Sequence, residues 1–387
     1  MLKLFEHPFL GRGFRPFFFL GALYSVISLV LWGGFYAGYI VPPYFMIDAV
    51  SWHAHEMIYG FSMAIVAGFL LTAVANWTGG APARQMHLAG LCLLWLLGRV
   101  VMHFDFGLPA WAIIAVESAF IPALALSLAI PLIRSWNKRN FIFLTLLSVL
   151  FACDLWFLLT INMAALHAAL MMILIMISLI GGRIIPAFTV AALRRKGIET
   201  YQTPQIKMDV AALVSLVAVA LCLVFAKGTP ILGIAAGVSC LIHGLRMRHY
   251  HTLKTFDDPL DWILHAGYCW LVVGLGLLAL TGFGALGVAA VIHALTAGAI
   301  GTMILGMICR VTLGHTGRDL KLGALTTLSF FAIQVTAIAR VFGPIFMPDH
   351  MNEWVIGSAA LWSLCFAAYL WVYTPMLFTA RPDGQVA

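Results

Sequence analysis

Charged residues are scarce in this chain of 387 residues: 10% are Asp, Glu, Lys or Arg, whereas 63% are hydrophobic. Soluble domains have about a quarter charged residues and about half apolar ones. A soluble core cannot hide this much apolar surface, so lipid must surround most of the chain. The net charge of +7 is spread over short clusters between apolar runs. That pattern excludes the concentrated basic surface of a nucleic-acid-binding domain.

Cysteine patterns for disulfides, zinc or covalent haem are also missing. The seven cysteines occur singly inside apolar segments, and no two of them form a C-x-x-C pair. This excludes a disulfide framework and a c-type haem attachment site. Phosphate-binding glycine loops, dinucleotide fingerprints and the elbow that carries a serine nucleophile are equally absent. No common class of soluble enzyme is therefore indicated.

Long apolar runs take the place of these motifs, and a run of about 20 apolar residues can cross a bilayer as a helix. The predicted spans are residues 17–40, 52–76, 86–104, 110–133, 140–160, 163–182, 209–227, 230–246, 260–282, 285–309, 322–342 and 352–378. The sequence therefore predicts an all-α polytopic membrane protein, with residues 1–387 forming a single integral membrane domain. Arg15 and Pro16, in a phenylalanine-rich segment, predict a re-entrant or interfacial turn.

Basic residues are distributed unevenly around these spans. Lys227 lies in a loop on the side opposite the termini, and Arg99 and Arg340 lie near that end of their spans; the rest of the 22 Lys and Arg residues belong to the terminal side. The positive-inside rule then places both termini in the cytoplasm. Spans two, six and ten all run inward from the outer face.

Spans two, six and ten also resemble one another. His55 precedes Thr78-Gly79, and His293 precedes Thr316-Gly317, by the same spacing, while His167 opens span six in a similar way. This similarity predicts an internal repeat, with chance likeness among apolar helices as the alternative. The repeat units would be three groups of four helices, near 1–135, 136–256 and 257–387.

Ionisable side chains inside a bilayer are costly and mark functional sites. Sorting them by depth gives two groups. The outer group contains His53, His55, His167 and His293 with the acids Glu56, Glu117 and Asp154. The inner group contains His243, His265 and His315, with Arg183 and Arg310 close by. Imidazole is a common ligand of haem iron, copper and zinc, so the two groups predict two metal sites.

Spacing and charge limit the roles within these groups. His53 and His55 stand two residues apart, so on a helix their rings point about 160° apart and do not share one ion. Haem propionates need cationic partners, for which Arg99 and Arg340 are the outer candidates, and Arg183 and Arg310 the inner ones. The alternatives are that each histidine bonds a carbonyl of a facing helix and that the inner arginines anchor helix ends.

Several motifs together resemble the NnrS family. They are Gly13-Phe14-Arg15-Pro16-Phe17-Phe18, Trp52-His53-Ala54-His55-Glu56-Met57, Asn76-Trp77-Thr78-Gly79, Gly181-Gly182-Arg183-Ile184-Ile185-Pro186, His293-Ala294-Leu295-Thr296-Ala297-Gly298 and Gly314-His315-Thr316-Gly317-Arg318. Members of that family are haem- and copper-containing bacterial membrane proteins associated with denitrification and nitric oxide stress. The resemblance spans nearly the whole chain and implies haem, copper and a nitric oxide context.

The predicted topology is also similar to the twelve-helix core of haem–copper oxidases and nitric oxide reductases. In those proteins metal-binding histidines lie near the outer face on spans that include two, six and ten. His55, His167 and His293 fall on the same spans at that depth. The match is incomplete, because span seven has no adjacent histidine pair and the His-x-His sequence lies on span two.

Together these features predict a protein that holds copper and two b-type haems, binds nitric oxide and reduces it with electrons from an unidentified donor. The predicted outer ligands are His55, His167 and His293, with His53 as a ligand or a hydrogen-bonding neighbour; His265 and His315 are the predicted ligands of the inner haem. Glu56, Glu117 and Asp154 are predicted to supply the protons that N–O cleavage consumes. A copper or haem transport protein, favoured by the 17 methionines, and a membrane nitric oxide sensor are the alternatives.

Overall fold

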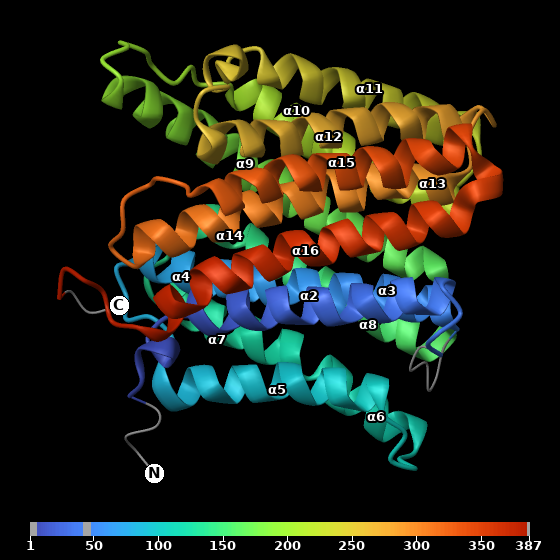
Figure 1. The fold of residues 1–387 in the computed structure, drawn as a ribbon, viewed down its shortest axis with the longest axis horizontal. Helices are drawn as coiled ribbons and strands as arrows, with labels where there is room; N and C mark the ends of the chain where they lie inside the picture. Colours follow the sequence, from blue (N-terminus) through green and yellow to red (C-terminus); the bar gives the residue numbers. More distant parts are fainter. Residues whose placement is uncertain (1–5, 42–47, 385–387) are drawn as a thin grey trace. The chain divides into compact units, whose positions relative to one another are not determined.

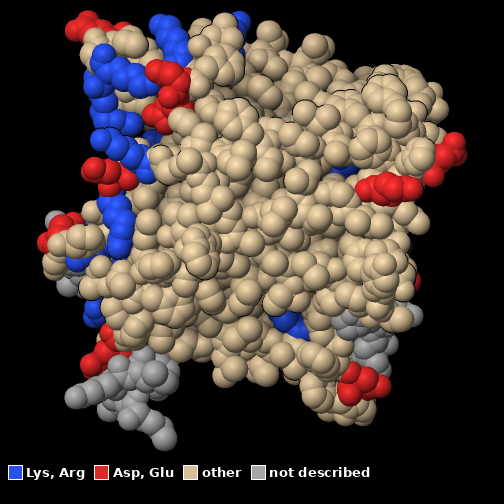
Figure 2. All heavy atoms as spheres, in the orientation of Figure 1, with Lys and Arg blue, Asp and Glu red and all other residues tan. Residues whose placement is uncertain are grey.

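The computed structural model describes residues 6–41 and 48–384, and every regular element in them is a helix. Among these residues, twelve helices are long and apolar enough to cross a membrane. The predicted all-α membrane architecture is therefore confirmed. Most of the molecular face drawn in Figure 2 carries no charged side chain, as a surface in contact with lipid requires.

The chain forms two compact units. Unit 1 comprises Met1–Ala169, Ile308–Leu320 and Phe366–Ala387, and unit 2 comprises Leu170–Met307 and Lys321–Cys365. Three helices contribute to both units: α9 (Met163–Arg195), α14 (Thr302–His315) and α16 (Met351–Phe378). The division into three four-helix repeats stays a prediction.

The other elements of unit 1 are η1 (Pro8–Leu10), α2 (Phe14–Tyr36), α3 (Ala49–His55), η2 (Glu56–Ser62), α4 (Met63–Thr78), α5 (Gln85–His103), α6 (Ala110–Ser118), α7 (Phe120–Arg134), η3 (Lys138–Asn140) and α8 (Ile142–Thr160). Those of unit 2 are α10 (Ile206–Phe225), α11 (Pro230–Met247), η4 (Thr252–Lys254), α12 (Pro259–Gly282), α13 (Val288–His293), η5 (Ala294–Gly301), α15 (Ala324–Phe346) and η6 (Pro348–His350). In unit 1, α2 packs along α4, and α7 packs against α4 and α8 (Figure 1). In unit 2, α12 packs against α11 and η5.

The second span, Ala49–Thr78, is a continuous helix whose centre, η2, is a π-helix. Asp48 caps its N-terminus, because the Asp48 side chain accepts hydrogen bonds from the backbone amides of Val50 and Ser51. Within η2, the Ser62 hydroxyl donates to the Met57 carbonyl at 2.7 Å, which satisfies a carbonyl in the widened turn. Because π-helical turns occur mostly at functional sites, the centre of this span is where a site is expected.

The tenth span repeats this design. Its π-helix η5 begins directly after His293, as η2 begins directly after His55. Five residues after each histidine stands a glycine, Gly60 or Gly298, and an aromatic ring of the preceding span occupies the place of its missing side chain. The ring is Tyr24 for Gly60 and Trp270 for Gly298. These shared features support the relation between spans two and ten that the sequence predicts.

Two local predictions are wrong. Span six does not end near residue 182, because α9 continues to Arg195. The residues beyond 182 are mostly good helix formers, and Pro186 removes a single backbone hydrogen bond from the helix. The predicted interfacial turn at Arg15-Pro16 is instead the first turn of α2, where proline is tolerated because the first amides of a helix have no intrahelical partner.

Candidate metal centre

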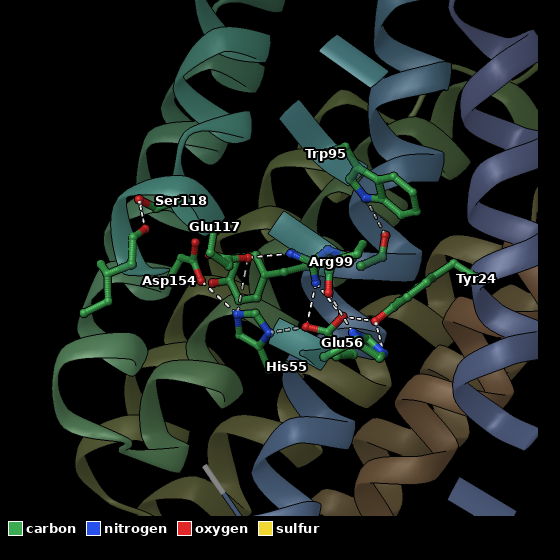
Figure 3. A network of polar contacts seen from close by, with 12 residues as sticks. Tyr24, His55, Glu56, Trp95, Arg99, Glu117, Ser118 and Asp154 are labelled. Carbon is green, nitrogen blue, oxygen red and sulfur yellow. Dashed lines mark hydrogen bonds and ion pairs between the residues drawn. The ribbon is translucent and has the colours of Figure 1, made fainter. Parts of the chain in front are cut away.

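His55 is fully buried at the junction of α3 and η2. Its ring stacks on Phe157 of α8, with centroids 5.3 Å apart and planes 22° apart. Nδ1 of His55 is 2.9 Å from Oε1 of Glu56, and Nε2 is 3.1 Å from Oδ1 of Asp154 and 3.6 Å from Oε1 of Glu117. Both ring nitrogens therefore face carboxyl oxygens, and those oxygens come from three different spans (Figure 3).

Arg99 of α5 joins two of these carboxyl groups. Its Nη1 donates to both oxygens of Glu56 at 2.6 Å, and its Nη2 donates to Oε1 of Glu117 at 2.6 Å. At Gly98 the two helices are in contact, since a Cβ there would lie 3.4 Å from the Glu117 backbone. Arg99 thus binds protein carboxylates, and its role as a propionate partner stays a prediction.

Local sequence explains how Glu117 and Asp154 are presented. The fourth span is interrupted after Ser118, because Pro122 has no N–H to donate to the Ser118 carbonyl. Glu117 is the last but one residue before this break and is 4% exposed. Asp154 lies well inside α8 and is 1% exposed. The two acids therefore meet His55 away from water.

The cluster has more acidic than basic groups. Glu56, Glu117 and Asp154 share one guanidinium, and uncompensated charge is strongly disfavoured inside a membrane. With a neutral His55, one divalent cation would balance the two remaining negative charges, as would two protons. The potential ligand atoms of His55, Glu117 and Asp154 lie within 4.8 Å of one another. Within the described part of the chain, Oε2 of Glu117 and Oδ2 of Asp154 are buried without a hydrogen-bond partner, so oxygen atoms are available to a cation.

The donor set fits a non-haem metal ion. One imidazole nitrogen with carboxylate oxygens suits a divalent first-row ion such as iron(II), zinc or copper(II). Thiolate and thioether ligands, which favour copper(I), do not belong to the group found among the described residues. Haem does not fit at His55 as the side chain stands, because both ring nitrogens face carboxyl groups and one ring face is covered by Phe157.

The NnrS family model, described as NnrS protein, matches residues 8–381. The chain belongs to the NnrS family. Among curated proteins, none matches it. Membership in this family indicates that the chain is a membrane protein related to nitric oxide, and it suggests that the chain binds a metal or haem. Within this NnrS-family chain, the predicted motif around His55 and Glu56 thus forms the centre of the buried cluster.

The remaining outer histidines do not belong to the group of three found among the described residues. His53 stacks on Trp32, with centroids 4.2 Å apart and planes 7° apart, so it projects from a different side of the span than His55, as the spacing predicts. His167 is half-buried on α9 in unit 1. His293 is half-buried on α13 in unit 2, with Nδ1 2.9 Å from the carbonyl of Ala289. Their roles as metal ligands stay predictions.

The inner histidines have different partners. His265 has Nε2 2.8 Å from the Thr189 hydroxyl and Nδ1 3.0 Å from the Thr252 hydroxyl. His243 has Nδ1 2.8 Å from the Tyr268 hydroxyl, and its Nε2 is buried without a hydrogen-bond partner. Both lie in unit 2, whereas His315 lies in unit 1. Haem ligation by His265 and His315, and metal binding by His243, stay predictions.

A buried arginine that the sequence did not single out organises the surroundings of His243. Arg246 donates to Oδ1 of Asp209 at 2.6 Å and to the Tyr268 hydroxyl at 2.9 Å. Gly182 provides the space, because a Cβ there would collide with the Arg246 guanidinium. Three further arginines are predicted propionate partners: Arg183 is half-buried on α9, Arg310 is 6% exposed on α14 and Arg340 is half-buried on α15. Their propionate roles stay predictions.

Two further residues extend the metal centre toward the end of α5. Tyr24 of α2 donates a hydrogen bond to Oε2 of Glu56, and its hydroxyl is 3.5 Å from Nε2 of His103. His103 is the last residue of α5 and donates through Nδ1 to the Arg99 carbonyl at 2.7 Å. Sequence reasoning missed both residues. A tyrosine is ordinary in an apolar span, and a histidine at a span end looks like an interfacial residue.

Proposed function

We propose that this NnrS-family protein binds nitric oxide at a metal ion held by His55, Glu117 and Asp154, and reduces it. This proposal rests on one observation: an imidazole and three carboxyl groups are buried around a single guanidinium within helices that can cross a membrane. Nitric oxide is small and uncharged, so it reaches such a site through lipid. Copper and b-type haem are the cofactors that the family resemblance suggests, with the termini in the cytoplasm of a bacterial inner membrane.

The reaction requires protons as well as electrons. Two nitric oxide molecules, two electrons and two protons give nitrous oxide and water; a nitrogen–nitrogen bond forms, one nitrogen–oxygen bond breaks, and the released oxygen leaves as water. A bound redox metal supplies the coordination of nitric oxide and the entry of electrons from an external donor. Glu117 and Asp154 would bind the metal as carboxylates, so the protons reach it through Glu56, which contacts the other nitrogen of His55 and lies outside the ligand group.

Glu56, Tyr24 and His103 provide a route for these protons. Glu56 contacts His55 on one side and Tyr24 on the other, and Tyr24 reaches His103. His103 is half-buried and precedes Phe104, which is 61% exposed at the end of the span. The series therefore connects the buried cluster with the water-exposed loop after α5 through groups that each accept and release a proton.

A Tyr24→Phe variant tests this route. Losing the hydroxyl is expected to slow nitric oxide consumption about 100-fold, at the lower end of what a proton-transfer group contributes, without changing the metal content. Tyr36→Phe, on the same helix but in contact with Trp32 instead of the cluster, is the matched control. Equal consumption rates in wild type and Tyr24→Phe would rule the route out.

The proposed function itself is tested on the purified, full-length protein by metal analysis and optical spectroscopy. We expect a metal ion that resists dialysis, a reducible haem spectrum, and consumption of nitric oxide with a reductant. A folded protein without metal or colour would overturn the proposal. Metal that exchanges freely, with no uptake of nitric oxide, would support the transport alternative.

A further inference from the structure

Two sequence motifs far apart in the chain meet in unit 1. Arg12 Nη1 is 3.3 Å from Nδ1 of His315, and the Phe14 ring lies 5.6 Å from the His315 ring. From the end of the chain, Arg381 donates to the His315 carbonyl at 3.2 Å. Arg318 approaches the same region, since its Nη2 lies 3.4 Å from the Thr379 hydroxyl. These contacts lie at the start of α2 and at the ends of α14 and α16, away from the proposed metal centre.

Arg15 is the buried residue of this group, with an exposed fraction of 0%. Its Nη1 donates to the carbonyls of Met376, Leu377 and Thr379 at 3.3, 2.8 and 2.7 Å. One edge of the guanidinium thus satisfies the last carbonyls of α16. Its Nε and Nη2 are buried without hydrogen-bond partners among the described residues, and leaving such charged donors unpaired is costly.

The unpaired atoms form a recognisable donor pattern. Nε and Nη2 lie on one edge of the guanidinium and present parallel N–H groups, which is the fork that carboxylate and phosphate oxygens bind. Arg12 adds another buried Nε without a partner. Arg12, Arg318 and Arg381 all lie near enough to Arg15 to repel its charge. Burial, together with the charge of Arg381, lowers the pKa of Arg12.

We propose that Arg12, Arg15, Arg318 and Arg381 bind a phosphate-type oxyanion, with the Nε and Nη2 edge of Arg15 as its central contact. An anion there satisfies the unpaired donors and relieves the repulsion among the four cations. Asp383 pairs with Arg381 at 2.5 Å, which leaves Arg15 without a carboxylate of its own among its hydrogen-bond partners. This inference is independent of the proposed metal chemistry.

The oxyanion has two possible sources, a lipid head group and free phosphate. A lipid is favoured by the neighbouring aromatic cluster: Phe9 stacks on Phe378 at 4.2 Å, and Phe19 lies 5.4 Å from Phe378. Aromatic rings beside basic groups at the ends of spans are typical of the membrane interface. The acyl chains of a lipid would then lie along these rings while its phosphate contacts the arginines.

The test uses full-length protein in detergent, stripped of lipid, with Arg12→Gln and Arg15→Lys as variants. Native mass spectrometry measures retention of phosphatidylglycerol, and thermal unfolding measures the response to inorganic phosphate. We expect wild type to retain the lipid and each variant to bind it about tenfold more weakly, because a charge-assisted hydrogen bond is lost. Arg139→Gln, an exposed arginine of unit 1, is the control.

Each outcome decides the proposal. Retention of phosphatidylglycerol that both variants weaken supports a lipid phosphate, and stabilisation by inorganic phosphate that both variants weaken supports a free oxyanion. If Arg15→Lys does not fold, Arg12→Gln alone tests the proposal. Arg12 contacts His315, whereas the carbonyls at the end of α16 are bound by Arg15, so losing Arg12 leaves those helix-end bonds in place. Binding of neither probe by wild type, or equal binding by wild type and Arg12→Gln, would overturn the proposal.

Discussion

Replacing His55 by asparagine is expected to lower the affinity of the buried cluster for its metal by about 100-fold or more. Loss of a side chain that merely supports a ligand costs 10- to 100-fold, roughly, and His55 supplies the one imidazole of the donor set. The protein should still insert, because one residue changes the hydropathy of a 30-residue span very little. Metal per chain, measured by mass spectrometry after dialysis against a metal buffer, checks the result.

The control for this variant is His87→Asn. His87 is exposed on α5, with Nε2 2.9 Å from the Ser127 hydroxyl, so its loss should leave the metal content unchanged. Equal metal content in wild type and His55→Asn would rule out His55 as a ligand of the metal in the cluster. The same measurement on His167→Ala and His293→Ala tests whether those histidines are also ligands, as their depth predicts.

The architecture could be predicted because membrane spans depend on length and hydropathy alone. Twelve apolar runs predicted twelve spans, and the described residues form twelve helices long and apolar enough to cross a membrane. Span ends were less predictable, since the helix of span six continues through the mixed segment 183–195 once tertiary contacts hold it. The π-helices after His55 and His293 carry no composition signal of their own. Their presence depends on packing against neighbouring helices, which a single sequence does not encode locally.

Depth along a span also predicted part of the site. It placed His55 with the acids Glu117 and Asp154, and these side chains do meet. Depth does not say which way a side chain projects, however, so it could not predict that His53 contacts Trp32 while His55 contacts the acids. The unusual position of Arg99 for a basic residue suggested a propionate partner; the structure pairs it with carboxylates of the chain, and the propionate role stays a prediction. Direction around the helix axis requires the packing of neighbouring spans.

An Arg99→Gln variant is expected to lose about 3 to 5 kcal/mol of stability, the usual cost of breaking a buried ion pair by removing one partner. Arg99 is 6% exposed and donates to both Glu56 and Glu117. Without it, the carboxyl groups have only the cation of the metal centre, or protons, to balance them. The midpoint of thermal unfolding in detergent, compared with that of the exposed control Arg134→Gln, measures the loss.

A second substitution shows whether the loss comes from the uncompensated acid. In Arg99→Gln with Glu56→Gln, one positive and one negative charge disappear together, so part of the stability should return. Arg99→Lys, which keeps the charge but not the two-pronged donor geometry, should fall between wild type and Arg99→Gln. Strictly additive losses in the double variant would show that the pair is not coupled. Because a divalent cation would balance the same acids, removing the metal should lower the stability of Arg99→Gln further. Equal stability of Arg99→Gln with and without the metal would show that the arginine and the metal do not balance the same carboxylates.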